Sequence, residues 1–366
     1  MLIINFRKLM KKVFILSLVF AMCFSMVASV ALADTTVNVV TNLTKSTGGG
    51  ATPVVKAKWE MRSNRAVTAD GLDDGDIGHQ AQFLPSGDVA YNTGIEICAV
   101  ANDPDGLGDI QAVYADMFYP GVEESPVHPT WGCGEQWGDE LELTQLDKQA
   151  GIDLFCGLVK TNDVDLPVFY ESYNWDEICN TNTGELYKNT AFVYCGTRDL
   201  SYEAPAGLYE VKVHAVDTAG IDSEERVNQF NYIGAVGFET DFTSVAYGSV
   251  KLNTEKIVSG DLNMSTPAQP TVTSVGNVRI NMKVMQDDMA FGTTGGVYNV
   301  GYKARVGSAA ADTSYAPFAE ATLARTLELS ETEEMDFGIL VTKFPNNGPY
   351  QGIMTLSAAE VAFVSC

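Results

Sequence analysis

Two groups of aspartates are the residues of this chain whose types and spacing come closest to a chemical site. The stretch DPDGLGDIQAVYADMFYP (103–120) contains Asp103, Asp105 and Asp109, and Asn102 precedes it. Carboxylate and amide oxygens are the ligands that calcium prefers, although no glutamate stands where an EF-hand loop would need one. Asp-Pro-Asp-Gly is also the sequence of a tight turn. Two interpretations stay open: a turn alone, and a turn that binds calcium.

A second acidic group lies upstream in DGLDDGDIG (70–78), which supplies Asp73, Asp74 and Asp76. This stretch is interpreted as a solvated loop, a calcium loop or a partner of the first group. Neither group has a fixed ligand spacing, so calcium is the only cofactor that the sequence suggests.

Catalytic signatures are missing from the sequence. It contains no G-x-S-x-G, no H-E-x-x-H, no phosphate-binding loop and no dinucleotide fingerprint. Paired carboxylates of the glycoside hydrolase kind cannot be picked out of so many acidic residues. We therefore expect a protein that is not an enzyme, with an extracellular hydrolase as the weakest alternative.

The first 33 residues have the order of a secretory signal peptide. Four basic residues precede an apolar run from Val13 to Val30, and the run ends in Ala31-Leu32-Ala33. Cleavage is predicted before Asp34, and a retained membrane anchor is the alternative. The sequence thus predicts a secreted protein of the cell surface, without a transmembrane anchor after cleavage.

The net charge of the chain is −24, from 47 acidic and 23 basic residues. Signal cleavage removes four of the basic residues and none of the acidic ones. Nucleic acids and anionic membranes attract basic patches, so this balance excludes nucleic acid as a partner and favours solubility and divalent cations.

Six cysteines remain after cleavage, an even number that predicts disulfides in an exported chain. Structural zinc is disfavoured because no C-x-x-C occurs and no histidine lies within four residues of a cysteine. The pairing stays open, and one arrangement keeps four cysteines within a single stapled segment. The six are Cys98, Cys133, Cys156, Cys179, Cys195 and Cys366.

Alternating apolar and polar residues predict strands along most of the remaining chain. PVVKAKW (53–59) alternates, GIEICAVA (94–101) is an apolar run, and IQAVYADMFY (110–119) alternates again. In GLYEVKVHAVDTAG (207–220), Tyr209 and every second residue to Ala215 share one face, as in a half-buried antiparallel strand.

These segments together resemble the immunoglobulin-like β-sandwiches of prokaryotic exported surface proteins, without indicating a specific family. The resemblance implies a sandwich over 53–234 whose late strand carries a tyrosine near its start. It departs from that pattern at 121–202, a long insertion rich in Cys and Trp that we expect to be mixed α/β. Residues 34–52, which include TNLTKSTGGGATP, are predicted to be a flexible lead-in.

Residues 235–366 predict a second β-sandwich or jelly roll, which makes the fold class all-β. VGNVRINMKV places Val278, Ile280, Met282 and Val284 inward, and PNNGPYQGIMTL (345–356) is interpreted as a closing hairpin. Export, strand edges and the lack of reactive groups favour a structural subunit of a bacterial or archaeal envelope, a surface layer, sheath or filament that acts by self-association or with other envelope proteins. The alternative is an adhesion module that binds glycans or proteins through Trp131, Trp137 or Trp175.

Overall fold

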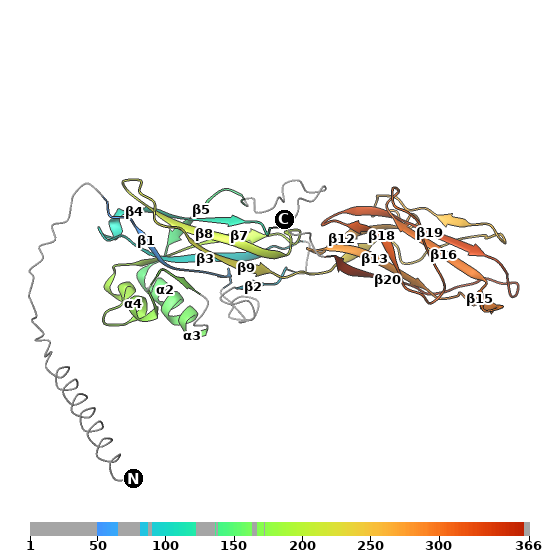
Figure 1. Ribbon diagram of the computed structural model, residues 1–366, viewed down its shortest axis with the longest axis horizontal. Helices are drawn as coiled ribbons and strands as arrows, with labels where there is room; N and C mark the ends of the chain where they lie inside the picture. The colour runs from blue at the N-terminus through green and yellow to red at the C-terminus, as the bar shows by residue number, and fades with distance from the viewer. Residues whose placement is uncertain are drawn as a thin grey trace, which may run out of the picture. The chain divides into compact units, whose positions relative to one another are not determined.

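The computed structural model describes residues 50–64, 81–86, 90–121, 136, 138–162, 167–171 and 173–361 (Figure 1). Strands dominate these ranges, and short helices occur only at Leu107–Asp109 and between Lys148 and Lys188 among the described residues. The predicted all-β class is confirmed. No helix in these ranges is long and apolar enough to cross a membrane. Several predictions fall outside the described residues: the signal peptide, most of the lead-in, Asp73, Asp74, Asp76, Trp131, Trp137, Cys133 and Cys366.

The first half of the described chain forms one nine-stranded sheet, in the order β2-β9-β8-β4-β5-β7-β3-β1-β6. All neighbours pair antiparallel except β2 and β9. The strands are β1 (Val54–Arg62), β2 (Gln82–Phe83), β3 (Thr93–Asn102), β4 (Ile110–Phe118), β5 (Leu141–Gln145), β6 (Val168–Phe169), β7 (Phe192–Leu200), β8 (Gly207–Asp217) and β9 (Arg226–Tyr232).

The sheet curls so that its first and last long strands, β1 and β9, meet across the core. Lys58 of β1 contacts Asn228 of β9, although the two strands are not hydrogen-bonded neighbours in the sheet. Between them, the alternation predicted for β8 holds: Tyr209, Val211, Val213 and Ala215 are fully buried. Burial of one face of a strand is the main source of its stability, because each large apolar side chain contributes about 1.5–3 kcal/mol.

The predicted insertion is mixed α/β, but it is not a separate subdomain. Its strands β5 and β7 lie inside the sheet between β4 and β3, so the main sheet is incomplete without them. Its helical part covers the other side of β1, where the ring of Phe155 lies 4.8 Å from those of both Trp59 and Trp175. The helical segments are α2 (Lys148–Ile152), the π-helical turn η2 (Asp153–Val159), α3 (Lys160–Asn162), α4 (Trp175–Cys179) and α5 (Glu185–Lys188).

Two disulfides lie within the described residues. Cys98 of β3 bonds to Cys195 of β7, its direct neighbour across the two strands, and Cys156 bonds to Cys179. The arrangement that keeps four cysteines within the insertion is therefore wrong. Strand β7 lies beside β3 in the nine-stranded sheet, so Cys195 faces Cys98, which is outside the insertion.

Tyr209 occupies the place near the start of β8 that the resemblance implied. Its ring is fully buried, and its hydroxyl donates a 2.9 Å hydrogen bond to the carbonyl oxygen of Pro205, four residues upstream. A buried tyrosine bonded in this way to the backbone a few residues upstream is similar to the tyrosine corner of immunoglobulin-like sandwiches.

Replacing Tyr209 with Phe is expected to lower the free energy of unfolding by about 1–2 kcal/mol, because the buried carbonyl of Pro205 loses its donor while ring packing is kept. Urea denaturation of wild type and Tyr209→Phe measures the difference. Tyr91→Phe, at an exposed tyrosine, is the control and should leave the midpoint unchanged. Equal midpoints for wild type and Tyr209→Phe would contradict the expectation.

The second half of the described chain forms two further sheets and a small hairpin. The order β10-β12-β19-β16-β17, with β11 also paired to β19, makes one sheet, and β18-β13-β20 makes the other. The strands are β10 (Phe238–Thr240), β11 (Lys256–Val258), β12 (Thr271–Ser274), β13 (Arg279–Gln286), β14 (Thr293–Thr294), β15 (Val297–Tyr298), β16 (Val300–Val306), β17 (Thr313–Tyr315), β18 (Ala321–Leu327), β19 (Thr332–Val341) and β20 (Met354–Val361).

The apolar core of this second half is separate from that of the first. Val278, Ile280, Met282 and Val284 are buried in it, as the alternation predicts. The predicted closing hairpin is wrong, because β19 and β20 belong to different sheets and residues 342–353 cross between them. Strand β20 therefore lies at the edge of its sheet, where it pairs only with β13 among the described residues.

Candidate calcium site

The first acidic group folds into a compact cluster at the turn between β3 and β4. One carboxylate oxygen from each of Asp103, Asp105 and Asp109 lies within 4.8 Å of the others. The turn is built as its sequence predicts: Asp103 Oδ1 accepts a 2.7 Å hydrogen bond from the Asp105 amide, and Gly106 has the positive φ of 122° that favours glycine. A short 3₁₀ helix, η1 (Leu107–Asp109), then brings Asp109 back towards Asp103.

A fourth aspartate, Asp217, joins the cluster from the end of β8. Its Oδ1 accepts hydrogen bonds from the amides of Ala219 (2.8 Å) and Ile221 (2.7 Å). The next residue, Thr218, ties the two turns together, because its amide donates to the carbonyl of Asp109 (2.8 Å) and its hydroxyl donates to Asp109 Oδ1. The sequence analysis missed Asp217, which ends a strand in VDTAG more than a hundred residues downstream of the first cluster.

Three buried oxygen atoms at this turn have no hydrogen-bond donor within the described part of the chain. They are Oδ2 of Asp103, Oδ2 of Asp217 and Oδ1 of Asn102. Asp103 is only 4% exposed and Asp217 is fully buried. Leaving such a group unpaired costs about 1–3 kcal/mol, and more when it is charged. Buried carboxylates are accordingly paired or bound to a metal ion.

The electrostatics of the cluster also favour a cation. The pKa of Asp103 is raised above the usual 3.8, first by burial and then by the charges of Asp109, Asp105 and Asp217. The charges that raise the pKa of Asp103 repel its carboxylate, and the fold holds the groups together against that repulsion. A divalent ion bound among their oxygens would reverse that effect and would supply the partner that the unpaired atoms lack.

The last part of the predicted lead-in lies on this cluster. The amide of Ala51 donates a 2.7 Å hydrogen bond to Asp105 Oδ2. Gly50 approaches Asp217 so closely that a Cβ atom there would collide with Asp217 Oδ2, so only glycine fits. Asp103, Asp105 and Asp109 thus bring three carboxylates together, with the charge of Asp217 close enough to act on Asp103. Oxygen ligands of this kind are those that calcium prefers.

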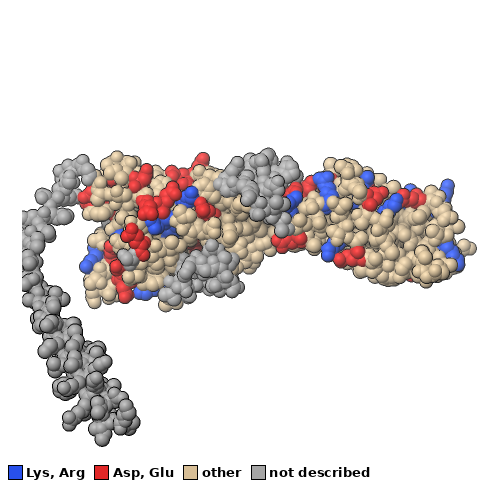
Figure 2. Space-filling model, in the orientation of Figure 1, with Lys and Arg blue, Asp and Glu red and all other residues tan. Residues whose placement is uncertain are grey.

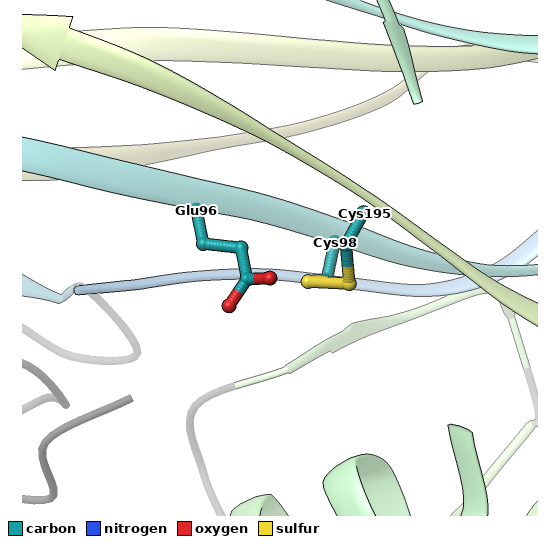
Figure 3. Close-up of side chains that lie close together, drawn as sticks. All are labelled: Glu96, Cys98 and Cys195. Carbon is teal, nitrogen blue, oxygen red and sulfur yellow. A yellow bond between two sulfur atoms is a disulfide. The ribbon is translucent and has the colours of Figure 1, made fainter. Parts of the chain in front are cut away.

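Two other groups of potential ligands occur among the described residues, and neither has the features of a metal site. Glu96 lies beside Cys98 and Cys195, but both sulfur atoms are engaged in the disulfide (Figure 3). The second group is a surface cluster of Asp116, Glu140 and His214, in which His214 Nε2 lies 3.6 Å from Glu140 Oε1. Figure 2 shows that acidic side chains are spread over one face of the molecule, so a surface group alone is not distinctive.

Trp175, the described member of the proposed glycan-binding tryptophans, has a structural role, as do the nearby Tyr170 and Tyr173. Trp175 is half-buried, with its ring 4.8 Å from that of Phe155. Tyr170 stacks on the guanidinium of Arg226 at 4.3 Å, and Tyr173 lies under Lys56 Nζ at 4.5 Å. Packing and cation–π contacts account for these three side chains.

Comparison with known proteins gives only distant similarity. No family model matches the chain, and no curated protein matches it. Among solved structures, the CsuC-CsuE chaperone–tip adhesin pre-assembly complex of Acinetobacter baumannii has 11% identity and a TM-score of 0.25, over 69% of this chain and 85% of that one. The C-terminal domain of the Streptococcus pyogenes antigen I/II-family protein AspA has 11% identity and a TM-score of 0.20, over 83% and 96%. These values assign neither a family nor a function.

Proposed function

We propose that the chain is an exported, calcium-stabilised structural subunit of a cell surface, which assembles with copies of itself. Export is supported by the two disulfides, because such bonds persist in oxidising compartments outside the cytosol. Calcium is supported by the buried unpaired oxygens of Asp103 and Asp217. Together, these features suit a protein whose work is to hold its shape outside the cell.

The observation that carries self-assembly is the edge strand β20. It is eight residues long, and Glu360 is its only charged residue. Natural sheets protect their edges with charges, prolines or short strands, and a long edge with few charges is a template for pairing with another strand. Its core-facing Met354 and Leu356 are only partly buried, and the preceding Ile353 is 73% exposed. We assign this edge to the same edge of a second copy, paired antiparallel.

Sedimentation of the purified chain with and without millimolar calcium tests this assignment. We expect a dimer or larger assembly, and we expect Ser357→Lys to weaken it by about tenfold, because two-fold pairing places the new charges near each other across the interface. The control is Thr322→Lys on β18, an exposed position at the opposite edge of the same sheet. A chain that stays monomeric at high concentration, or loses assembly equally in both variants, would overturn the proposal.

A second candidate function, adhesion, is favoured by one feature of the second half. A groove of about 710 Å³ runs beside β16 and β19 and is lined by Val297, Tyr298 and Leu340. That volume falls within the range of small-ligand sites, which are typically apolar and aromatic. A monomeric chain that retains a ligand in this groove would favour adhesion over assembly.

A further inference from the structure

The side chains of Lys58, Glu60 and Asn228 meet inside the curled first sheet, so that the ion pair of Lys58 and Glu60 also contacts a side-chain amide. Lys58 and Glu60 stand two residues apart on one face of β1, and both are fully buried. Asn228 projects from β9 on the opposite side of the core. Lys58 Nζ contacts both Glu60 Oε1 and Asn228 Oδ1, and Asn228 Nδ2 donates a 2.6 Å hydrogen bond to Glu60 Oε2.

The three groups that an amide exchange needs are in contact with one another. The amine nitrogen of Lys58 touches the carbonyl of the Asn228 side chain, the Asn228 amide nitrogen touches Glu60, and Glu60 also touches the amine. A nucleophile, an acyl group and a proton carrier are thus in mutual contact. Holding reactants in contact can lower the activation free energy of their reaction by several kcal/mol, because folding has already brought them together.

Burial prepares Lys58 as a nucleophile. Desolvation lowers the pKa of its ammonium group, and the neighbouring Glu60 carboxylate opposes that shift. A lysine in a dry, apolar site transfers its proton readily to an adjacent base and becomes a neutral amine, which is the reactive form. Water is excluded from the two β1 side chains, so hydrolysis does not compete.

We propose that Lys58 and Asn228 join in an intramolecular amide bond, with Glu60 as the catalytic acid and base. Glu60 takes a proton from the Lys58 ammonium, and the freed Nζ lone pair attacks Cγ of Asn228. After Glu60 returns this proton to Nδ2, the Cγ–Nδ2 bond breaks and ammonia departs, taking the second proton that Nζ loses and leaving as an ammonium ion. Overall, one ammonium group and one primary amide give one secondary amide and one ammonium ion, with no oxidant, metal or second substrate.

A neighbouring lysine shows why the inference is confined to this position. Lys56, on the same strand, is 1% exposed and also pairs with a glutamate, Glu185. Its Nζ lies over the ring of Tyr173, and no side-chain amide of the described residues contacts it. Lys56 therefore has a base but no acyl group and supplies a matched control within the same strand.

Mass spectrometry of the purified chain tests the proposal. After reduction of the disulfides, we expect the intact mass to be lower by about 17 Da than the sequence from the measured N-terminus requires, which is the loss of one ammonia. Proteolysis should release one branched peptide that joins the segment containing Lys58 to the segment containing Asn228. A folded chain of full sequence mass, or an ammonia loss that maps to other residues, would overturn the proposal.

The peptide map of the wild type tests whether the bond exists, and it does so even if a variant fails to fold. Variants then test the role of each residue. Glu60→Gln and Lys58→Arg should each show the full sequence mass and no branched peptide. Lys56→Arg should retain the ammonia loss. In addition, denatured wild type should run faster than Glu60→Gln on reducing gels, because a cross-link between residues 170 positions apart keeps the denatured chain compact. Persistence of the branched peptide in Glu60→Gln would overturn the role of Glu60.

Discussion

Calcium at about 100 times its dissociation constant is expected to stabilise the folded chain by about 2.7 kcal/mol. For a unit the size of the first sheet, this raises the midpoint of thermal unfolding by about 5–10 °C. The ion would bind the buried oxygens of Asp103 and Asp217, which have no donor of their own, and would neutralise the charges of Asp105 and Asp109. Calorimetry with calcium and with a chelator measures the shift.

The variant Asp217→Asn separates metal binding from the structural role of this side chain. Asparagine keeps the Oδ1 acceptor for the amides of Ala219 and Ile221 but removes the charge. We expect the variant to unfold at a higher temperature than wild type in chelator and to lose most of the response to calcium. Asp147→Asn, at an exposed aspartate on another loop, should respond as wild type does. Equal midpoints for wild type with and without calcium would contradict the site.

The response to calcium should also depend on pH. The pKa of Asp103 is raised above 3.8 by burial and by the facing carboxylates of Asp105, Asp109 and Asp217. Without calcium, the folded chain therefore holds this proton to a higher pH than the unfolded chain does, so Asp103 lowers stability as the pH rises through that window. Acidification removes this penalty and adds protons that compete with the ion. The difference between the midpoints of thermal unfolding with calcium and with chelator should therefore shrink as the pH falls from 7 towards 4.

Removing the Cys98–Cys195 disulfide by alanine substitution of both residues is expected to lower the free energy of unfolding by about 2–5 kcal/mol. The bond closes a loop with a sequence separation of 97 and joins two directly paired strands in the middle of the sheet. Both residues are buried, so their removal also leaves a small cavity. Urea denaturation of the double variant measures the loss.

The second disulfide provides the comparison. Cys156 and Cys179 are separated by 23 residues, so the chain-entropy argument predicts a loss smaller by about 1 kcal/mol when both are replaced with alanine. Equal or reversed losses in the two double variants would show that loop closure is not the main source of stabilisation.

Sequence periodicity predicted those parts of the fold in which a strand buries one face. Every second residue from Tyr209 to Ala215 and from Val278 to Val284 is buried, as the alternation predicts. The same rule assigns Lys56 and Lys58 to a solvent face, and there it is wrong. Strand β1 is covered on both sides, by the helical segments and by β9, so its polar residues are buried as well. The burial of these polar residues is determined by tertiary packing and not by the local sequence pattern.

Only part of the candidate calcium site could be predicted from the sequence, because local patterns do not show which strands pair. Asp103, Asp105 and Asp109 are close in sequence, so their shared turn could be predicted. Asp217 reaches them only because β8 pairs with β4, a non-local pairing that local patterns do not encode. The position of β5 and β7 within the sheet depends on the same kind of pairing, which is why residues 121–202 were interpreted as an insertion.

The meeting of β1 with β9 has a mechanical consequence. Tension applied along the chain enters the first sheet at β1 and leaves it at β9, so the contact between Lys58 and Asn228 lies directly on the path of the load. If a covalent bond joins Lys58 to Asn228, the segment between these two residues, which are 170 positions apart, carries no force. The sheet then cannot be pulled open from its ends. In a filament built from such units, the first sheet of every copy would stay intact under load.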